Sequence, residues 1–72
     1  MWKMKVEQLG TGRQWDEEIT RENDNSKWVK ISKKCGKEKA LEYAEKVISY
    51  FNSTLREGER ARKVVGVFFD DN

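Results

Sequence analysis

The sequence predicts an α+β fold, in which one long amphipathic helix packs on one face of a small, mostly antiparallel sheet. Between Lys37 and Arg56, apolar residues recur every three or four positions, which is the spacing of one helix face. Elsewhere the apolar residues fall in short runs of the kind found in strands. Because a chain of 72 residues is short, we expect residues 1–72 to form a single β-β-β-α-β domain.

The first half of the chain is predicted to form three strands of an antiparallel meander. Residues 2–9 alternate apolar and polar side chains, as in a strand with one buried face. Two glycines at 10–12 then favour a hairpin turn. Residues 14–20 alternate less clearly, and residues 27–33 again resemble a strand. The polar tract at 22–26 is typical of a loop between them.

The helix is predicted to begin after Gly36 and to end before Gly58, because glycine is tolerated at both caps. Residues 61–69 follow as the last strand. They are apolar on both faces, which favours a central position in the sheet, and the crossover through the helix predicts parallel pairing beside the first strand. The expected helix stripe consists of Ala40, Leu41, Ala44, Val47, Ile48, Phe51 and Leu55.

Composition narrows the function classes. Fifteen basic and thirteen acidic residues give a net charge of +2, and there is no histidine. The only cysteine is Cys35, so neither an intrachain disulfide nor a cysteine-rich zinc site can form. We expect no cofactor and no metal. The sequence shows no signal segment and no apolar run of ~20 residues, so we expect a cytoplasmic protein that does not enter a membrane.

Catalysis is not predicted. General base chemistry usually needs histidine or a carboxylate with a raised pKa beside a partner. The acidic run Asp16, Glu17 and Glu18 places neighbouring side chains on opposite faces of a strand. Cys35 lies between lysines before a helix start, where a thiolate is favoured, but a lone cysteine is more often a small packed side chain. We therefore expect a protein without enzymatic activity.

A protein-binding face is the leading functional hypothesis. One helix covers only one face of a sheet, so if Val29 and Ile31 face the helix, Trp28 points to the uncovered face with Phe68. Exposed aromatic patches mark partner or dimer surfaces. In the alternative interpretation, the flanking loop or the tyrosines at the stripe margin shield these rings. The predicted protein-binding residues are Trp15, Trp28 and Phe68.

Nucleic-acid binding is the second hypothesis. Residues 27–39 hold six lysines against one glutamate, a net charge of +5, while the rest of the chain is slightly acidic. Such a segment can contact phosphates, although it can equally be a solvated strand edge. Three strands followed by a helix, with Trp28 and Ala44, resemble the DNA-binding domain of AP2 type and the arm-site-binding domain of some phage integrases. The predicted nucleic-acid-binding residues are Lys27, Lys30, Lys33, Lys34, Lys37 and Lys39.

The chain ending, FNSTLREGERARKVVGV from Phe51 to Val67, resembles the tails of small uncharacterised proteins encoded by bacteriophages. That resemblance implies an accessory protein of viral origin that binds and modulates a host or viral protein. It transfers no catalytic residue. A homodimer formed through the uncovered sheet face is a further expectation.

Overall fold

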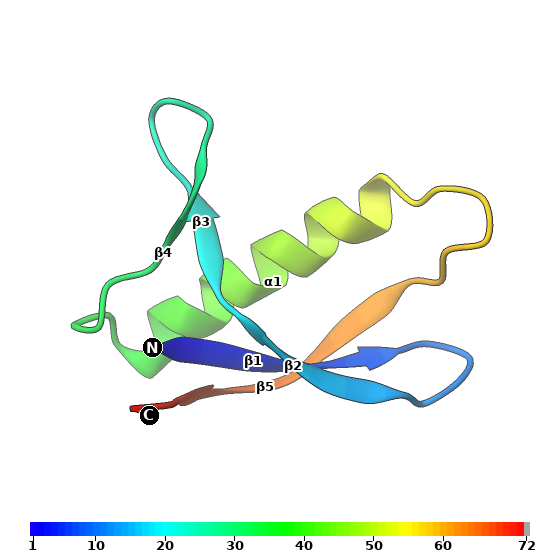
Figure 1. The fold of residues 1–72 in the computed structure, drawn as a ribbon, viewed down its shortest axis with the longest axis horizontal. Helices are drawn as coiled ribbons and strands as arrows, with labels where there is room; N and C mark the ends of the chain where they lie inside the picture. Colours follow the sequence, from blue (N-terminus) through cyan, green and yellow to red (C-terminus); the bar gives the residue numbers. More distant parts are fainter. Residues whose placement is uncertain (72) are drawn as a thin grey trace.

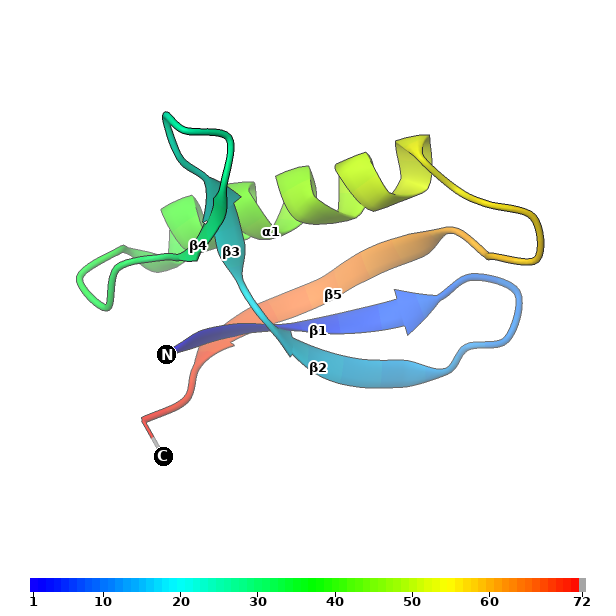
Figure 2. The ribbon, with the colours of Figure 1, turned by 45° about the horizontal axis from the view of Figure 1, so that its top comes forward.

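The computed structural model describes residues 1–71 as five strands and one helix (Figure 1). The α+β prediction is therefore confirmed. The helix α1 packs on one side of a small antiparallel sheet, and a separate hairpin projects beside it (Figure 2). The elements are β1 (Trp2–Gln8), β2 (Gln14–Glu18), β3 (Thr20–Glu22), β4 (Trp28–Lys30), α1 (Lys37–Ser53) and β5 (Arg62–Phe69).

The core lies between α1 and the inner face of the sheet. Strand β1 is central, and its Met4 and Val6 side chains are fully buried. They meet Ala44 and Ile48 from the helix, as the alternating and helical patterns predict. Small alanines let the helix approach the sheet closely. The predicted stripe is too wide, however, because Leu41 at one margin of the helix remains exposed, as does Leu55 beyond it.

The last strand corrects two predictions: β5 pairs antiparallel to β1, not parallel, and it occupies an edge of the sheet, not the centre. The position of the helix start explains the antiparallel direction of β5. The indole of Trp2 donates a hydrogen bond to the carbonyl of Cys35, so α1 starts beside the N-terminal end of β1. Seventeen helical residues span ~26 Å. The chain therefore enters β5 at the far end of β1 and must run back.

The predicted three-stranded meander is wrong, because the second strand breaks at Ile19. The amide of Ile19 still donates to the carbonyl of Trp2, and its side chain is fully buried. The chain then leaves the sheet, and β3 pairs with β4 as a separate two-stranded hairpin. The amide oxygen of Asn23 accepts bonds from the backbone of Asn25 and Lys27, which closes the hairpin loop.

The helix also ends earlier than predicted, at Ser53. The hydroxyls of Ser53 and Thr54 both donate to the carbonyl of Tyr50, while the amide of Thr54 turns to Phe51. These bonds compete with the next helical turn. Gly58, expected at the helix end, instead lies in the loop with a φ of 86°.

Asn52 connects the last helical turn to the start of β5. Its side-chain amide donates to the carbonyl of Arg62, and its side-chain oxygen accepts from the amide of Arg62, both at 2.8 Å. The carboxamide thus satisfies the outward backbone groups of the edge strand as a neighbouring strand would. This pair of bonds fixes the position of the Arg62 side chain relative to the helix.

The outer face of the sheet carries charged pairs. Lys3 lies 2.9 Å from Asp70, Lys5 lies 3.0 Å from Asp16, and other pairs follow the same face. The hydrogen bond from Lys3 to Asp70 raises the pKa of the lysine. The carboxyl of Glu7 accepts a bond from the amide of Gln14 and faces Lys63, so its pKa is lowered. The uncovered face is therefore mainly polar.

Candidate binding groove

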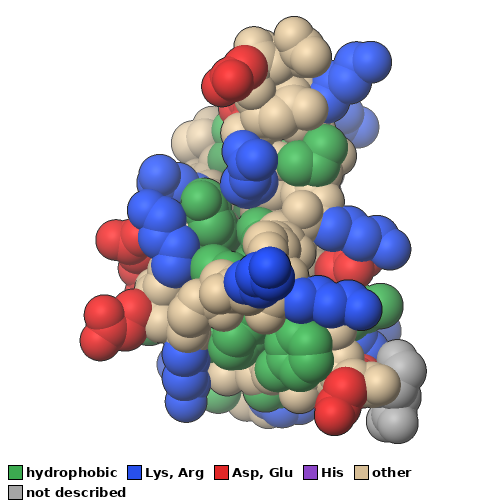
Figure 3. Space-filling view, turned by 90° about the vertical axis from the view of Figure 1, so that its left-hand side faces the viewer, with side chains coloured by type: hydrophobic (Ala, Val, Ile, Leu, Met, Phe, Trp, Pro, Cys, Tyr) green, Lys and Arg blue, Asp and Glu red, His purple; other side chains and the backbone are tan. Residues whose placement is uncertain are grey.

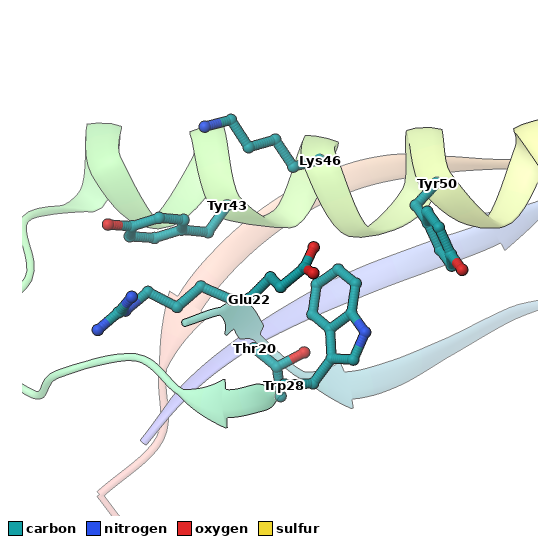
Figure 4. A pocket seen from close by; sticks show the side chains of 7 residues that line it. Thr20, Glu22, Trp28, Tyr43, Lys46 and Tyr50 are labelled. Carbon is teal, nitrogen blue, oxygen red and sulfur yellow. The ribbon is translucent and has the colours of Figure 1, made fainter. Parts of the chain in front are cut away.

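Trp28 lies against the helix, not on the sheet face opposite it. Strand β4 belongs to the hairpin, and the hairpin packs beside α1 (Figures 1 and 2). The indole of Trp28 points toward the helix, and its ring centre is 5.8 Å from that of Tyr50 (Figure 4). Neither ring is shielded, because Trp28 is 45% exposed and Tyr50 is 58% exposed. The prediction that Trp28 shares a face with Phe68 is therefore wrong.

Two hollows flank the Trp28 indole and together form what we call the aromatic groove. The first, of about 340 Å³, lies between the hairpin and the stretch of the helix from Tyr43 to Tyr50, with Tyr43 and Lys46 above it (Figure 4). The second, of about 270 Å³, lies between the helix and the inner face of β2. Trp28 and Tyr50 line both hollows. Val47 and Phe51 add apolar helix surface to the second, and Arg62 closes it.

Arg62 lies between two aromatic rings at the end of this groove. Its guanidinium carbon is 3.7 Å from the ring centre of Phe51 and 4.8 Å from that of Trp15. Glu17 approaches its Nη1 at 3.8 Å, which is too far for a hydrogen bond. Within the described part of the chain, the buried Nε of Arg62 has no hydrogen-bond acceptor. The two rings restrict the guanidinium, and its buried Nε is left without an acceptor.

The other two predicted binding aromatics lie on other surfaces. Trp15 faces inward from β2, opposite Val6, and its indole donates to the Glu17 carboxylate. With Arg13 and Arg62, it lines a hollow of about 260 Å³ that adjoins the aromatic groove at Arg62. Phe68 lies on the outer face of β5, opposite Lys3, and is 37% exposed. Trp28 and Trp15 therefore face connected hollows, whereas Phe68 is separate.

Sequence reasoning did not find the remaining groove residues. Tyr43 and Tyr50 were interpreted only as a possible shield for the rings, although their seven-residue spacing places them on one helix margin. The sequence near Arg62 shows its charge but not its place between two rings, because those rings come from β2 and from α1. Only the packing of the helix on the sheet brings these segments together.

The six lysines of residues 27–39 are distributed over two elements and a turn. Lys30 faces Glu18 at 3.6 Å, and Lys39 faces Glu42 at 3.3 Å, which raises the pKa of Lys39. Among the residues that the structure describes, the other four have no ion-pair partner. Lysine and arginine side chains spread over this end of the molecule, with hydrophobic patches between them (Figure 3). The four lysines without an ion-pair partner among the described residues are Lys27, Lys33, Lys34 and Lys37.

The three-stranded meander on which the AP2-type likeness depends is not formed, because β4 is outside the main sheet. A hollow of about 640 Å³ lies near the lysines, but Glu18, Asp70 and Asp71 line it together with Lys30 and Lys33. Its mixed charge does not favour an anion. The lysines therefore present separate points of positive charge and not one basic cavity.

Cys35 lies in the turn before α1, where its thiol is 3.5 Å from the carbonyl of Gly36. Across residues 1–71, no group of three or more acidic, cysteine or histidine side chains is placed to hold a metal ion. In the same residues, no helix is long and apolar enough to cross a membrane.

Comparisons with protein-family models, with curated proteins and with solved structures each gave no match. The resemblance to bacteriophage proteins therefore stays a prediction.

Proposed function

We propose that this protein is a non-enzymatic protein-binding module that accepts an apolar side chain of its partner in the aromatic groove. The observation that carries the proposal is the exposed Trp28–Tyr50 pair, which lines two adjacent hollows. Aromatic residues at the centre of a concave surface are typical binding hot spots, because they bury a large area at a small entropic cost. An accessory role, in a viral or host context, is part of the same proposal.

The charges around the groove favour a partner segment that is not basic. Arg21 and Lys46 border the first hollow and Arg62 borders the second, whereas Glu22 and Glu17 are the acidic residues there. The outer sheet face, in contrast, already pairs its charges within the chain. The groove thus combines open apolar surface with cations, and we place the partner there.

The proposal is tested by selecting peptides from a random displayed library on the immobilised protein. The best peptide is then titrated against wild type, Trp28→Ala and Leu41→Ala. Leu41 is a matched control, since it is an exposed apolar residue on the opposite margin of α1. Removing a central aromatic should weaken binding by about tenfold or more, whereas the control should stay within about twofold.

Three results would overturn the proposal. Binding that survives Trp28→Ala places the surface elsewhere, and a library without any enriched peptide argues against a peptide groove. Sedimentation equilibrium supplies the third: if wild type dimerises and Trp28→Ala does not, the occupant of the groove is a second copy of this chain. Circular dichroism confirms that each variant is folded.

Nucleic-acid binding is a second candidate, and the four lysines without ion pairs favour it. Because each phosphate contact releases counterions, binding to a 20-base-pair duplex should weaken steeply with salt. The double variant Lys33→Gln, Lys34→Gln should flatten the log–log slope by about two. Lys63→Gln, on the outer face of β5, is the control. Lack of binding to DNA and RNA at low salt rejects this candidate.

A further inference from the structure

We infer that Arg62 binds a carboxylate, so that the partner presents its C-terminal residue, with an apolar side chain, to the aromatic groove. This inference rests on the proposed function and specifies which peptide the groove accepts. The site consists of Arg62 between Phe51 and Trp15, with Arg13 nearby and Trp28 at the other wall of the shared hollow.

The guanidinium is prepared for an anion before any ligand arrives. Stacking between Phe51 and Trp15 restricts its rotation, and Asn52 holds the backbone of Arg62 from the helix. A planar guanidinium offers its terminal nitrogens as a fork that matches the two oxygens of a carboxylate. Because the side chain is restricted in advance, less entropy is lost when the ligand binds.

Arg62 has an ion-pair partner in Glu17, but within the described residues its buried Nε has no hydrogen-bond acceptor. Glu17 is the nearest carboxylate, yet its Oε1 accepts the indole hydrogen of Trp15 at 2.9 Å and lies 3.8 Å from Arg62. Because the Glu17 contact is too long for a hydrogen bond, a carboxylate that reaches the terminal nitrogens would make charge-assisted bonds that Glu17 does not make. Arg13, whose guanidinium is 5.8 Å from the Trp15 ring centre, adds a second positive charge to the adjoining hollow.

The size of the hollow favours a chain end over an internal acidic residue. Trp28 and Arg62 line the same hollow of about 270 Å³. A C-terminal residue carries its side chain and its carboxylate on one Cα, so one residue can reach both walls. An internal aspartate or glutamate would need a second residue to supply the apolar group, and the chain would have to continue out of the hollow.

The test uses N-acetyl-phenylalanine as the probe for a C-terminal residue. Its amide, without the carboxylate, and N-acetyl-aspartyl-phenylalanine amide, with an internal carboxylate, are the comparison ligands. Chemical-shift titration follows the indole protons of Trp15 and Trp28. Trp2 serves as an internal reference, because its indole donates a hydrogen bond to the backbone carbonyl of Cys35, outside the groove. For the first probe we expect a dissociation constant on the order of a millimolar, and binding about tenfold weaker for the amide.

Charge variants give effects of opposite sign. Arg62→Gln should weaken binding of N-acetyl-phenylalanine about tenfold more than binding of the amide, while Arg56→Gln, an exposed loop arginine, should alter neither. Glu17→Gln should strengthen binding of N-acetyl-phenylalanine about twofold, because it removes a negative charge that repels the ligand carboxylate. The glutamine oxygen can still accept the hydrogen bond from the Trp15 indole. An arginine with only a packing role predicts neither change.

Each outcome separates this inference from the proposed function. If the amide binds as tightly as the acid and both need Trp28, the groove binds peptides but Arg62 does not recognise a carboxylate. If the internal carboxylate binds best, the chain-end assignment is wrong. If no probe shifts the Trp28 signal and no library peptide is enriched, the proposed function itself fails.

Discussion

The main sheet and the β3–β4 hairpin use the same helix in opposite ways. The sheet buries the alanine-rich side of α1, and its Met4 and Val6 lose all contact with solvent. The hairpin lies along a neighbouring margin of α1 and leaves Trp28 and Tyr50 half exposed. One helix thus stabilises the domain with one face and supplies the wall of a groove with another. The contacts that bury the core are therefore separate from those that form the groove.

The largest expected effect concerns the buried sheet side. Met4→Ala should lower the free energy of unfolding by about 2–5 kcal/mol, because it leaves a cavity at the centre of the core. Val29→Ala, in the hairpin, should cost about 1 kcal/mol or less. Urea denaturation followed by circular dichroism measures both. Equal losses would show that the hairpin belongs to the same packed core.

The next largest effect compares two tryptophans. Trp2 donates its indole hydrogen to Cys35 and packs edge-to-face on Phe69, so Trp2→Ala should cost about 3 kcal/mol. Trp28→Ala should cost about 1 kcal/mol or less, since much of its ring is already in water. Thermal unfolding distinguishes them. A reversed order would make Trp28 a structural residue and weaken the groove proposal.

Asn52 should show an intermediate effect. Asn52→Ala removes two hydrogen bonds to the backbone of Arg62, which should cost about 1–3 kcal/mol. Asn52→Asp can still accept from the amide of Arg62 and should lose less. Hydrogen exchange at the Arg62 amide, measured by NMR, should accelerate in the alanine variant. Unchanged exchange would indicate that another group replaces the carboxamide.

The smallest effect concerns pH and the outer sheet face. Gln14 and Lys63 lower the pKa of Glu7 below its unfolded value, so the folded state favours the ionised carboxyl. The contribution of Glu7 to folding stability is fully present above its unfolded pKa of about 4.3. It is lost as the pH falls through the lower pKa that Glu7 has in the folded state. Glu7→Gln should therefore reduce the loss of stability between neutral and acidic pH. An identical pH profile for wild type and variant contradicts this.

Local patterns predicted most of the fold. The alternation of β1 and the spacing of Ala40, Ala44 and Ile48 identified the buried faces correctly, because burial on one side imposes a period on a regular element. The glycines at 10 and 12 adopt positive φ in the predicted hairpin turn. The break at Ile19 was not predicted, since Ile19 continues the inward alternation of Trp15 and Glu17 and is buried as it would be in a continuing strand.

The groove was predicted only in part. The sequence predicts Trp28 on the sheet face opposite the helix, but the structure places it beside the helix, because the sequence does not reveal which sheet a short strand joins. The partnership of Trp28 with Tyr50, and of Arg62 with Phe51 and Trp15, joins residues that are 11 to 47 positions apart. Contacts at that separation leave no periodic signal along the chain.

An α+β domain with one helix, a buried β1 and a surplus of lysine between residues 27 and 39 can be predicted from the amino-acid order alone. These features depend on local periodicity and on composition, which a single chain displays directly. Three features required the packed chain: β5 returns antiparallel at an edge, the hairpin leaves the sheet, and Arg62 lies between two rings in a hollow that Trp28 also lines. The physical reason is that direction, edge position and convergence depend on where the helix ends relative to β1, and that is a property of packing in three dimensions.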